Sequence, residues 1–136
     1  MGSALAPAWR AARRNAIPAG WSLDGIPISD LQIQNRVPSR FSRPLSYIGR
    51  VETALNGEIS RTKPGPTLLL AQFALPYGPA VQVAAATHAL PYAVHLRGDD
   101  VWIWPHQSEE NLTAFRGVVR QAALVLGVSR AIVNEA

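Results

Sequence analysis

Residues 96–106 read LRGDDVWIWPH and place a Gly-Asp-Asp triplet between two apolar segments. A glycine followed by an aspartate between apolar runs is typical of a two-residue β-hairpin turn. With Gly98-Asp99 as that turn, Arg97 faces Asp100 across the hairpin, and the apolar residues on either side of the turn pair on one face. The stretch therefore predicts an antiparallel hairpin with an exposed charge pair beside its turn.

The same triplet has an alternative interpretation as a metal site. Viral RNA polymerases carry a similar Gly-Asp-Asp at a hairpin turn, where the carboxylates hold magnesium. Such a site needs a second acidic motif on an adjacent strand, and the acids outside the predicted hairpins and helix are Asp24 and Asp30, near the N-terminus. Because short motifs often match by chance, we favour the turn and expect no bound metal.

No other stretch carries a catalytic or cofactor-binding pattern. His88, His95 and His106 share no spacing typical of metal ligands. The sequence contains neither a glycine-rich phosphate loop nor a nucleophile motif around a serine. We therefore expect no catalytic residues, no metal, no cofactor and no enzymatic activity.

Further strand signals precede the triplet, in the body that we assign to residues 46–136. Asn56-Gly57, within residues 47–62, is the strongest short-range hairpin signal in the chain. The apolar residues 67–75 and 80–86 are strand candidates. These signals extend the predicted antiparallel sheet.

Helical signals follow the triplet. Ser108 is a good N-cap for a helix that ends at Gly127, and Ser129 caps a short final helix. The apolar stripe of the longer helix comprises Leu112, Phe115, Val119, Ala122 and Leu126. The predicted fold class is α+β: a small antiparallel β-sheet of hairpins, with a C-terminal amphipathic helix and a short final helix packed on one face.

Residues 1–45 form a basic segment that we expect to be an extended N-terminal arm. Residues 1–50 hold seven arginines against two aspartates, whereas residues 51–136 hold six basic and seven acidic side chains. Five prolines in the arm disfavour long helices and central strands. Such an arm is suited to contact an acidic partner or a neighbouring subunit. The residues predicted to make these contacts are Trp9, Arg10, Arg13, Arg14, Trp21, Ile26, Ile28, Arg36, Arg40 and Arg43.

His95, Trp102 and Trp104 form a second candidate site. In the predicted hairpin they share one face, because alternate residues of a strand point to the same side. The strip is either an interface that stacks on a partner or a second buried face of the sheet. Burial is the favoured interpretation. Burial by a neighbouring subunit would agree with both interpretations, since the strip would then be an interface and also buried.

Residues 121–136, QAALVLGVSRAIVNEA, resemble the core of a bacterial helix-turn-helix. The resemblance rests on five small, apolar and glycine positions: Ala123, Leu126, Gly127, Val128 and Val133. In that family the second helix enters the major groove of DNA. The resemblance implies that Arg130 and Asn134 lie nearest the base edges.

The absence of a catalytic pattern and the basic arm together set the expected function. We expect a non-enzymatic structural or assembly subunit of a homo-oligomer or of a large complex, similar to a virion or phage component. The alternative is a nucleic-acid-binding protein that uses the arm and the C-terminal motif. The sequence has no secretory signal and no apolar run of the roughly 20 residues that span a bilayer. An intracellular or virion location without membrane contact is therefore expected.

Overall fold

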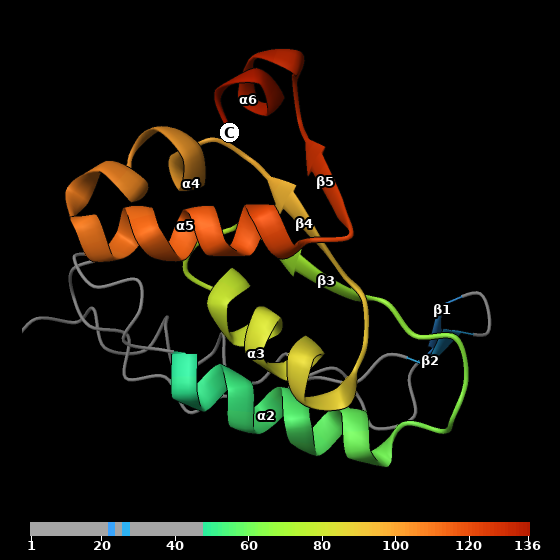
Figure 1. Cartoon of the computed structure of the whole chain (residues 1–136). Helices are drawn as coiled ribbons and strands as arrows, with labels where there is room; N and C mark the ends of the chain where they lie inside the picture. The colour runs from blue at the N-terminus through green and yellow to red at the C-terminus, as the bar shows by residue number, and fades with distance from the viewer. Residues whose placement is uncertain (1–21, 24–25, 28–47) are drawn as a thin grey trace, which may run out of the picture. The chain divides into compact units, whose positions relative to one another are not determined.

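A computed structural model describes residues 22–23, 26–27 and 48–136 (Figure 1). The chain forms two compact units, Met1–Gln32 and Ile33–Ala136. In the first unit, β1 (Ser22–Leu23) pairs antiparallel with β2 (Ile26–Pro27). The described elements of the second unit are α2 (Ile48–Arg61), β3 (Leu69–Gln72), α3 (Gly78–His88), β4 (Tyr92–Leu96), α4 (Asp99–Trp102), the 3-10 helix η2 (Pro105–Gln107), α5 (Glu109–Gln121), β5 (Leu124–Gly127) and α6 (Arg130–Glu135).

The second unit contains a three-stranded sheet in the order β3-β4-β5, and both strand pairs are parallel. In Figure 1 the three arrows point the same way, toward α4 and α6. Parallel neighbours cannot be joined by a tight turn, so a crossover connects each pair. Helix α3 joins β3 to β4, while α4, η2 and α5 lie between β4 and β5. The expected antiparallel sheet of hairpins is therefore wrong, and the fold is mixed α/β.

The hairpin predicted at Asn56-Gly57 is a helix. Residues 48–61 form α2, in which Val51, Leu55 and Ile59 recur every four positions and so share one side of the helix. Val51 is buried, and Leu55 packs against the core. The segment folds as a helix despite its turn signal, because burial of this apolar side stabilises the helix more than a two-residue turn stabilises an isolated hairpin.

The strand predicted over residues 80–86 is also a helix. This segment contains four alanines, the best helix-forming residue, and lies within α3. Ala80, Ala84 and Ala85 are buried. The helix ends at His88, and its C-cap Ala89 adopts the left-handed conformation while its backbone N–H donates to the carbonyls of Ala85 and Ala86. Small buried side chains let α3 lie close to its neighbours.

The strand predicted within residues 67–75 is confirmed as β3, and the N-caps at Ser108 and Ser129 are confirmed too. The Ser108 hydroxyl accepts from the Asn111 backbone N–H at 3.1 Å. However, α5 ends at Gln121 and does not extend to Gly127. Leu126, placed by sequence on the helix stripe, lies in β5 instead.

One face of the sheet packs against helices and forms the core. Tyr92, Val94 and Leu96 of the central strand are at most 4% exposed. They cluster with residues of β3, α3 and α5, including Ala71, Val81, Phe115 and Val118. The other face carries Leu70, Leu124 and Leu126, which are 42–50% exposed. No helix in the described part of the chain is long and apolar enough to cross a membrane.

Candidate functional site

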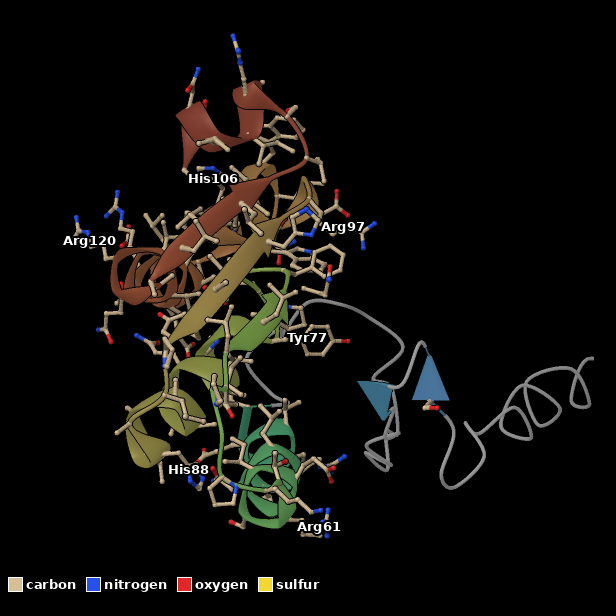
Figure 2. All side chains as sticks on the ribbon, turned by 90° about the vertical axis from the view of Figure 1, so that its right-hand side faces the viewer. Arg61, Tyr77, His88, Arg97, His106 and Arg120 are labelled. Atoms are coloured by element: carbon tan, nitrogen blue, oxygen red, sulfur yellow. The ribbon has the colours of Figure 1, made fainter. Side chains whose placement is uncertain are left out.

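The loops that follow the three parallel strands meet at one edge of the sheet, called here the carboxyl edge. In open sheets of this kind, ligands bind outside the carboxyl ends of the strands. The loops that form the carboxyl edge begin at Phe73, Arg97 and Val128. Figure 2 shows Tyr77 and Arg97 extending from the same side of the ribbon. The carboxyl edge is therefore the first candidate for a ligand site.

Asp100 holds two of these loops together. Its side chain is fully buried. Oδ1 accepts hydrogen bonds from the backbone N–H groups of Arg97 and Gly98, both at 2.9 Å. Oδ2 accepts from the backbone N–H of Ala74, in the loop after β3, at 2.8 Å. The carboxylate is thus occupied by three backbone donors and is not available to a ligand.

This geometry corrects the interpretation of the Gly-Asp-Asp triplet. Gly98 joins β4 to α4, and Asp99 and Asp100 are the first residues of that helix, so the predicted two-residue hairpin turn is wrong. Gly98 has φ of 140°, a backbone conformation that essentially requires glycine. Asp100 is buried and does not form the expected exposed pair with Arg97. Asp99 remains exposed.

Phe73 and Trp104 form an aromatic platform beneath Arg97. The Phe73 and Trp104 ring centroids lie 6.0 Å apart at an interplanar angle of 45°. The guanidinium carbon of Arg97 lies 5.3 Å from the centroid of the Phe73 ring, which is within cation–π range. Phe73 has φ of 108°, which is strained for a residue with a side chain. This strained residue lies directly after β3, where its ring meets a cation from the neighbouring loop.

The loop between β3 and α3 adds a hydroxyl group to the same edge. A cis peptide bond joins Leu75 to Pro76, both of which are buried. The next residue, Tyr77, is 42% exposed and immediately precedes α3. Gly78 opens that helix against α5, where an added Cβ would lie 2.7 Å from a methyl group of Val118. Close packing of the two helices thus fixes where Tyr77 emerges.

The predicted strip of His95, Trp102 and Trp104 is not a strand face. Only His95 lies in a strand, and its Nδ1 is 3.2 Å from Oε1 of Gln72. Trp102 lies in α4 and is 51% exposed. Trp104 follows α4 and packs against the core. The predicted strip required a hairpin that does not form. Of its three residues, Trp104 belongs to the aromatic platform.

The resemblance of residues 121–136 to a helix-turn-helix is not borne out by the structure either. Residues 124–127 form β5, paired with β4, so the first helix of the motif does not exist. Arg130 and Asn134 are exposed on α6, a helix of six residues. The predicted arm contacts stay predictions. Ile26 lies in β2 with its side chain undescribed, and the other predicted contact residues of the arm lie outside the described residues.

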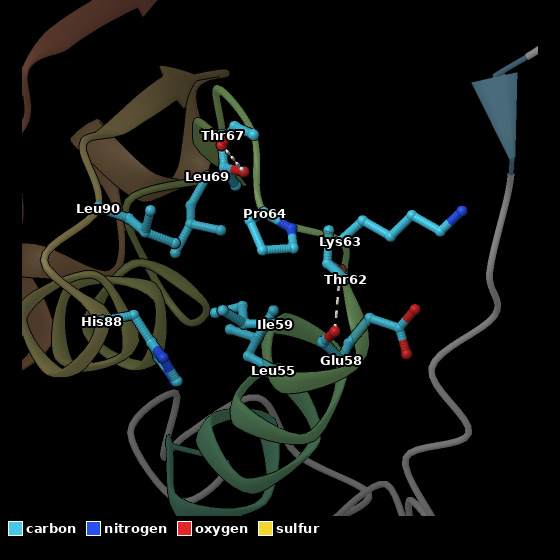
Figure 3. A pocket seen from close by; sticks show the side chains of 11 residues that line it. Leu55, Glu58, Ile59, Thr62, Lys63, Pro64, Thr67, Leu69, His88 and Leu90 are labelled. Atoms are coloured by element: carbon cyan, nitrogen blue, oxygen red, sulfur yellow. Dashed lines mark hydrogen bonds between the residues drawn. The ribbon is translucent and has the colours of Figure 1, made fainter.

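A pocket of about 510 Å³ opens at the opposite edge of the sheet (Figure 3). It lies between α2, the segment before β3 and the end of α3. Its apolar lining includes Leu55, Ile59, Leu69 and Leu90. His88, also in the lining, has Nε2 at 3.0 Å from Oδ1 of Asn56. The pocket lies at the amino ends of β3 and β4, away from the strained residues and the exposed polar groups of the carboxyl edge.

Sequence reasoning missed the contact between Phe73 and Arg97 and the exposed Tyr77 in the loop between β3 and α3. A signal existed in the spacing: an apolar strand, an alanine-rich segment of helical length and a second apolar strand are typical of a β-α-β unit. Recognition of that unit would have placed both loops at one edge. Among the residues that the structure describes, no group of three or more His, Asp or Glu side chains could hold a metal ion.

Comparisons with known proteins give one informative similarity. No protein-family model matches the chain, and no solved structure matches it with significance. Over 71 residues the chain is 39% identical to the candidate teichuronic acid biosynthesis glycosyltransferase TuaC of Bacillus subtilis (strain 168). The match covers 52% of this chain and 18% of that protein, so the chain corresponds to only a small part of its relative.

This similarity contradicts the functional prediction made from sequence. A non-enzymatic structural or assembly subunit, related to virion or phage components, was expected because no catalytic pattern was recognised. The matched protein is instead named as an enzyme. The nucleic-acid-binding alternative loses one of its two bases, because the C-terminal motif contains a strand, while the basic arm lies outside the described residues. The similarity therefore favours a relation to a glycosyltransferase over a structural virion subunit.

Proposed function

We propose that the chain forms part of a glycosyltransferase and that its carboxyl edge binds a sugar-containing substrate. The observation that carries this proposal is the 39% identity to TuaC over 71 residues. A parallel sheet with crossover helices supports it, since folds of this class bind ligands at the carboxyl ends of their strands.

The chemistry of glycosyl transfer defines what such a site must supply. The bond between the anomeric carbon and the leaving group of the donor breaks, and the leaving group takes the electron pair. The acceptor oxygen bonds to that carbon, and its hydroxyl proton passes to a base. A protein accelerates this step by holding donor and acceptor in a reactive geometry. Binding groups on fixed elements are therefore the first requirement.

The carboxyl edge offers binding groups suited to a sugar. Sugars present hydroxyl groups that both donate and accept hydrogen bonds, together with apolar C–H faces. The Tyr77 hydroxyl, the Asp99 carboxylate and the Arg97 guanidinium are all on exposed residues here. The Asp100 hydrogen bonds fix the backbone that carries the last two. A few fixed polar groups beside an aromatic surface are typical of small-molecule sites.

Nuclear magnetic resonance of the full chain, labelled with ¹⁵N, tests the proposal. We would titrate it with UDP-glucose, UDP-glucuronate, glucose and glucuronate, and with UMP as a nucleotide without sugar. The expected result is saturable shift changes in residues 73–78 and 97–100. Tyr77→Ala should weaken sugar binding, whereas Lys63→Ala, in the pocket at the opposite edge, should not.

Two outcomes would overturn the proposal. One is an absence of saturable binding by any sugar or sugar nucleotide at millimolar concentration. The other is a set of shift changes confined to the pocket between α2 and β3. Equal shifts with UMP and with the sugar nucleotides, and none with free sugars, would indicate a nucleotide site and would also contradict a sugar site.

A further inference from the structure

We infer that Arg97 binds an oxyanion of the substrate, either the carboxylate of a sugar acid or a phosphate group. The inference rests on the proposed function, because it assigns a substrate class to the same edge. It is carried by the placement of one arginine whose backbone and side chain are both held, and whose charge is unpaired within the described residues.

The backbone of Arg97 is held by the buried carboxylate. Its N–H donates to Oδ1 of Asp100 at 2.9 Å, and the same oxygen accepts from Gly98. Asp100 also holds Ala74, directly after Phe73 in the loop that follows β3. One buried side chain thus sets the distance between the segment that carries the cation and the segment that carries the aromatic ring.

The side chain of Arg97 is held by the Phe73 ring, with 5.3 Å between the guanidinium carbon and the ring centroid. Phe73 contacts Trp104, which packs against the core, so the ring has a firm support. The N–H donors of a guanidinium lie in its plane. Because Arg97 is exposed, these donors remain available to a planar or tetrahedral oxyanion, which arginine binds in a bidentate manner.

The charge of Arg97 has no counter-ion among the described residues. The single ion pair within these residues is between Arg61 and Glu58, at 3.0 Å. The neighbouring carboxylate of Asp100 is buried and fully occupied by backbone donors. The other neighbour, Asp99, forms no ion pair with Arg97. Arg97 itself is exposed. A fixed, exposed and unpaired guanidinium at a ligand-binding edge is suited to receive a negative charge.

Calorimetric titration of the full chain at fixed ionic strength tests the inference. The probes are glucuronate, glucose 1-phosphate, glucose and inorganic phosphate. Arg97→Gln should raise the dissociation constant for both charged sugars at least tenfold and should raise that for glucose far less. Arg97→Lys should restore only part of the affinity, because lysine lacks the planar fork. Arg120→Gln, which removes another exposed arginine, should have no effect.

A second variant tests the platform. Phe73→Leu keeps an apolar side chain but removes the ring, so the charged probes should bind severalfold more weakly, a larger loss of affinity than for glucose. The ratio of the affinities for glucuronate and glucose 1-phosphate in the native chain distinguishes a carboxylate from a phosphate. Thermal unfolding of each variant verifies that the fold is retained.

The outcomes separate this inference from the proposed function. If Arg97→Gln binds glucose, glucuronate and glucose 1-phosphate as the native chain does, the inference fails while the sugar site stands. If inorganic phosphate binds through Arg97 but no sugar binds, the inference stands and the proposed function fails. An equal loss of affinity for charged and neutral sugars in Arg97→Gln would also overturn it, since that pattern indicates a structural role.

Discussion

The Oδ2 atom of Asp100 lies 2.8 Å from the backbone nitrogen of Ala74, a residue 26 positions earlier in the chain. This bond joins the loop after β3 to the loop after β4 inside the protein. The other carboxylate oxygen accepts two further N–H groups, from Arg97 and Gly98. A buried acceptor that serves three backbone donors cannot be removed without leaving those donors unpaired. Asp100 is therefore the structural centre of the carboxyl edge.

Asp100→Asn should destabilise the protein by about 2–4 kcal/mol. An amide NH₂ replaces one acceptor oxygen, and the remaining hydrogen bonds are made to a neutral oxygen in place of a charged one. Asp99→Asn is the matched control. Because Asp99 is exposed, this substitution should change the unfolding free energy by at most about 0.5 kcal/mol. Urea unfolding of the two variants measures both effects. Equal stabilities of the two variants would contradict the buried arrangement.

Gly57→Ala should stabilise the protein by about 0.5–1 kcal/mol, because Gly57 lies inside α2 and glycine weakens helix interiors. An added Cβ there meets only the end of the Arg61 side chain, at 3.8 Å. In the hairpin turn expected from sequence, the same position would need positive φ and alanine would destabilise it. The sign of the change in urea midpoint thus distinguishes helix from hairpin.

Gly98→Ala is the opposite case and should cost about 1–3 kcal/mol. Its φ of 140° is one that alanine rarely adopts, although an added Cβ would meet only the Trp102 ring, at 3.8 Å. The expected loss therefore comes from backbone strain and not from a steric clash. Thermal unfolding of Gly98→Ala beside Gly57→Ala should show shifts of opposite sign, and shifts of the same sign would be inconsistent with this geometry.

Gly78→Ala should destabilise the protein by about 1–3 kcal/mol, even though alanine favours helices, because the site is overpacked. The new Cβ would lie 2.7 Å from Cγ1 of Val118, which is fully buried. In a Val118→Ala background that clash is absent, so the cost of Gly78→Ala should shrink. A double-mutant cycle of unfolding free energies measures this coupling, and strictly additive effects would refute the contact.

The parts of this fold that sequence predicted are those that local signals determine. The apolar run within residues 67–75 contains β3, and Ser108 and Ser129 cap helices. Each of these features depends on a few neighbouring residues. A capping hydroxyl, for example, satisfies N–H groups within the first turn of its own helix.

The parts that sequence missed depend on distant residues. Asn56-Gly57 is a strong turn signal, but the side of α2 that carries Val51 and Leu55 gains more by packing on the core. Parallel pairing of β3 with β4 requires α3 between them, and α3 was taken for a strand. The site was missed because the fold was predicted wrongly. Arg97 and Phe73 are 24 residues apart and meet only when both loops lie at one edge.

The hydroxyl of Tyr92 provides a test of the core that also depends on pH. It donates to the Val118 carbonyl at 2.6 Å, and this carbonyl also accepts from the Ala122 N–H at 3.2 Å. Tyr92→Phe should therefore cost only about 1 kcal/mol at neutral pH, because the carbonyl keeps one donor. Urea unfolding measures this loss.

The pH dependence of the unfolding free energy at alkaline pH should change as well. Burial raises the pKa of Tyr92 above its ordinary value of 10.0. Above pH 10 the unfolded chain loses this proton more readily than the folded chain, so the unfolding free energy falls as pH rises. The stability from the buried neutral phenol is thus complete below pH 10 and lost as pH rises through the raised pKa. In Tyr92→Phe the unfolding free energy should fall less steeply between pH 9 and pH 11 than in the native chain. Tyr77→Phe alters an exposed tyrosine and should leave the slope of the native chain unchanged. Identical alkaline slopes in the native chain and Tyr92→Phe would show that Tyr92 ionises equally well in both states.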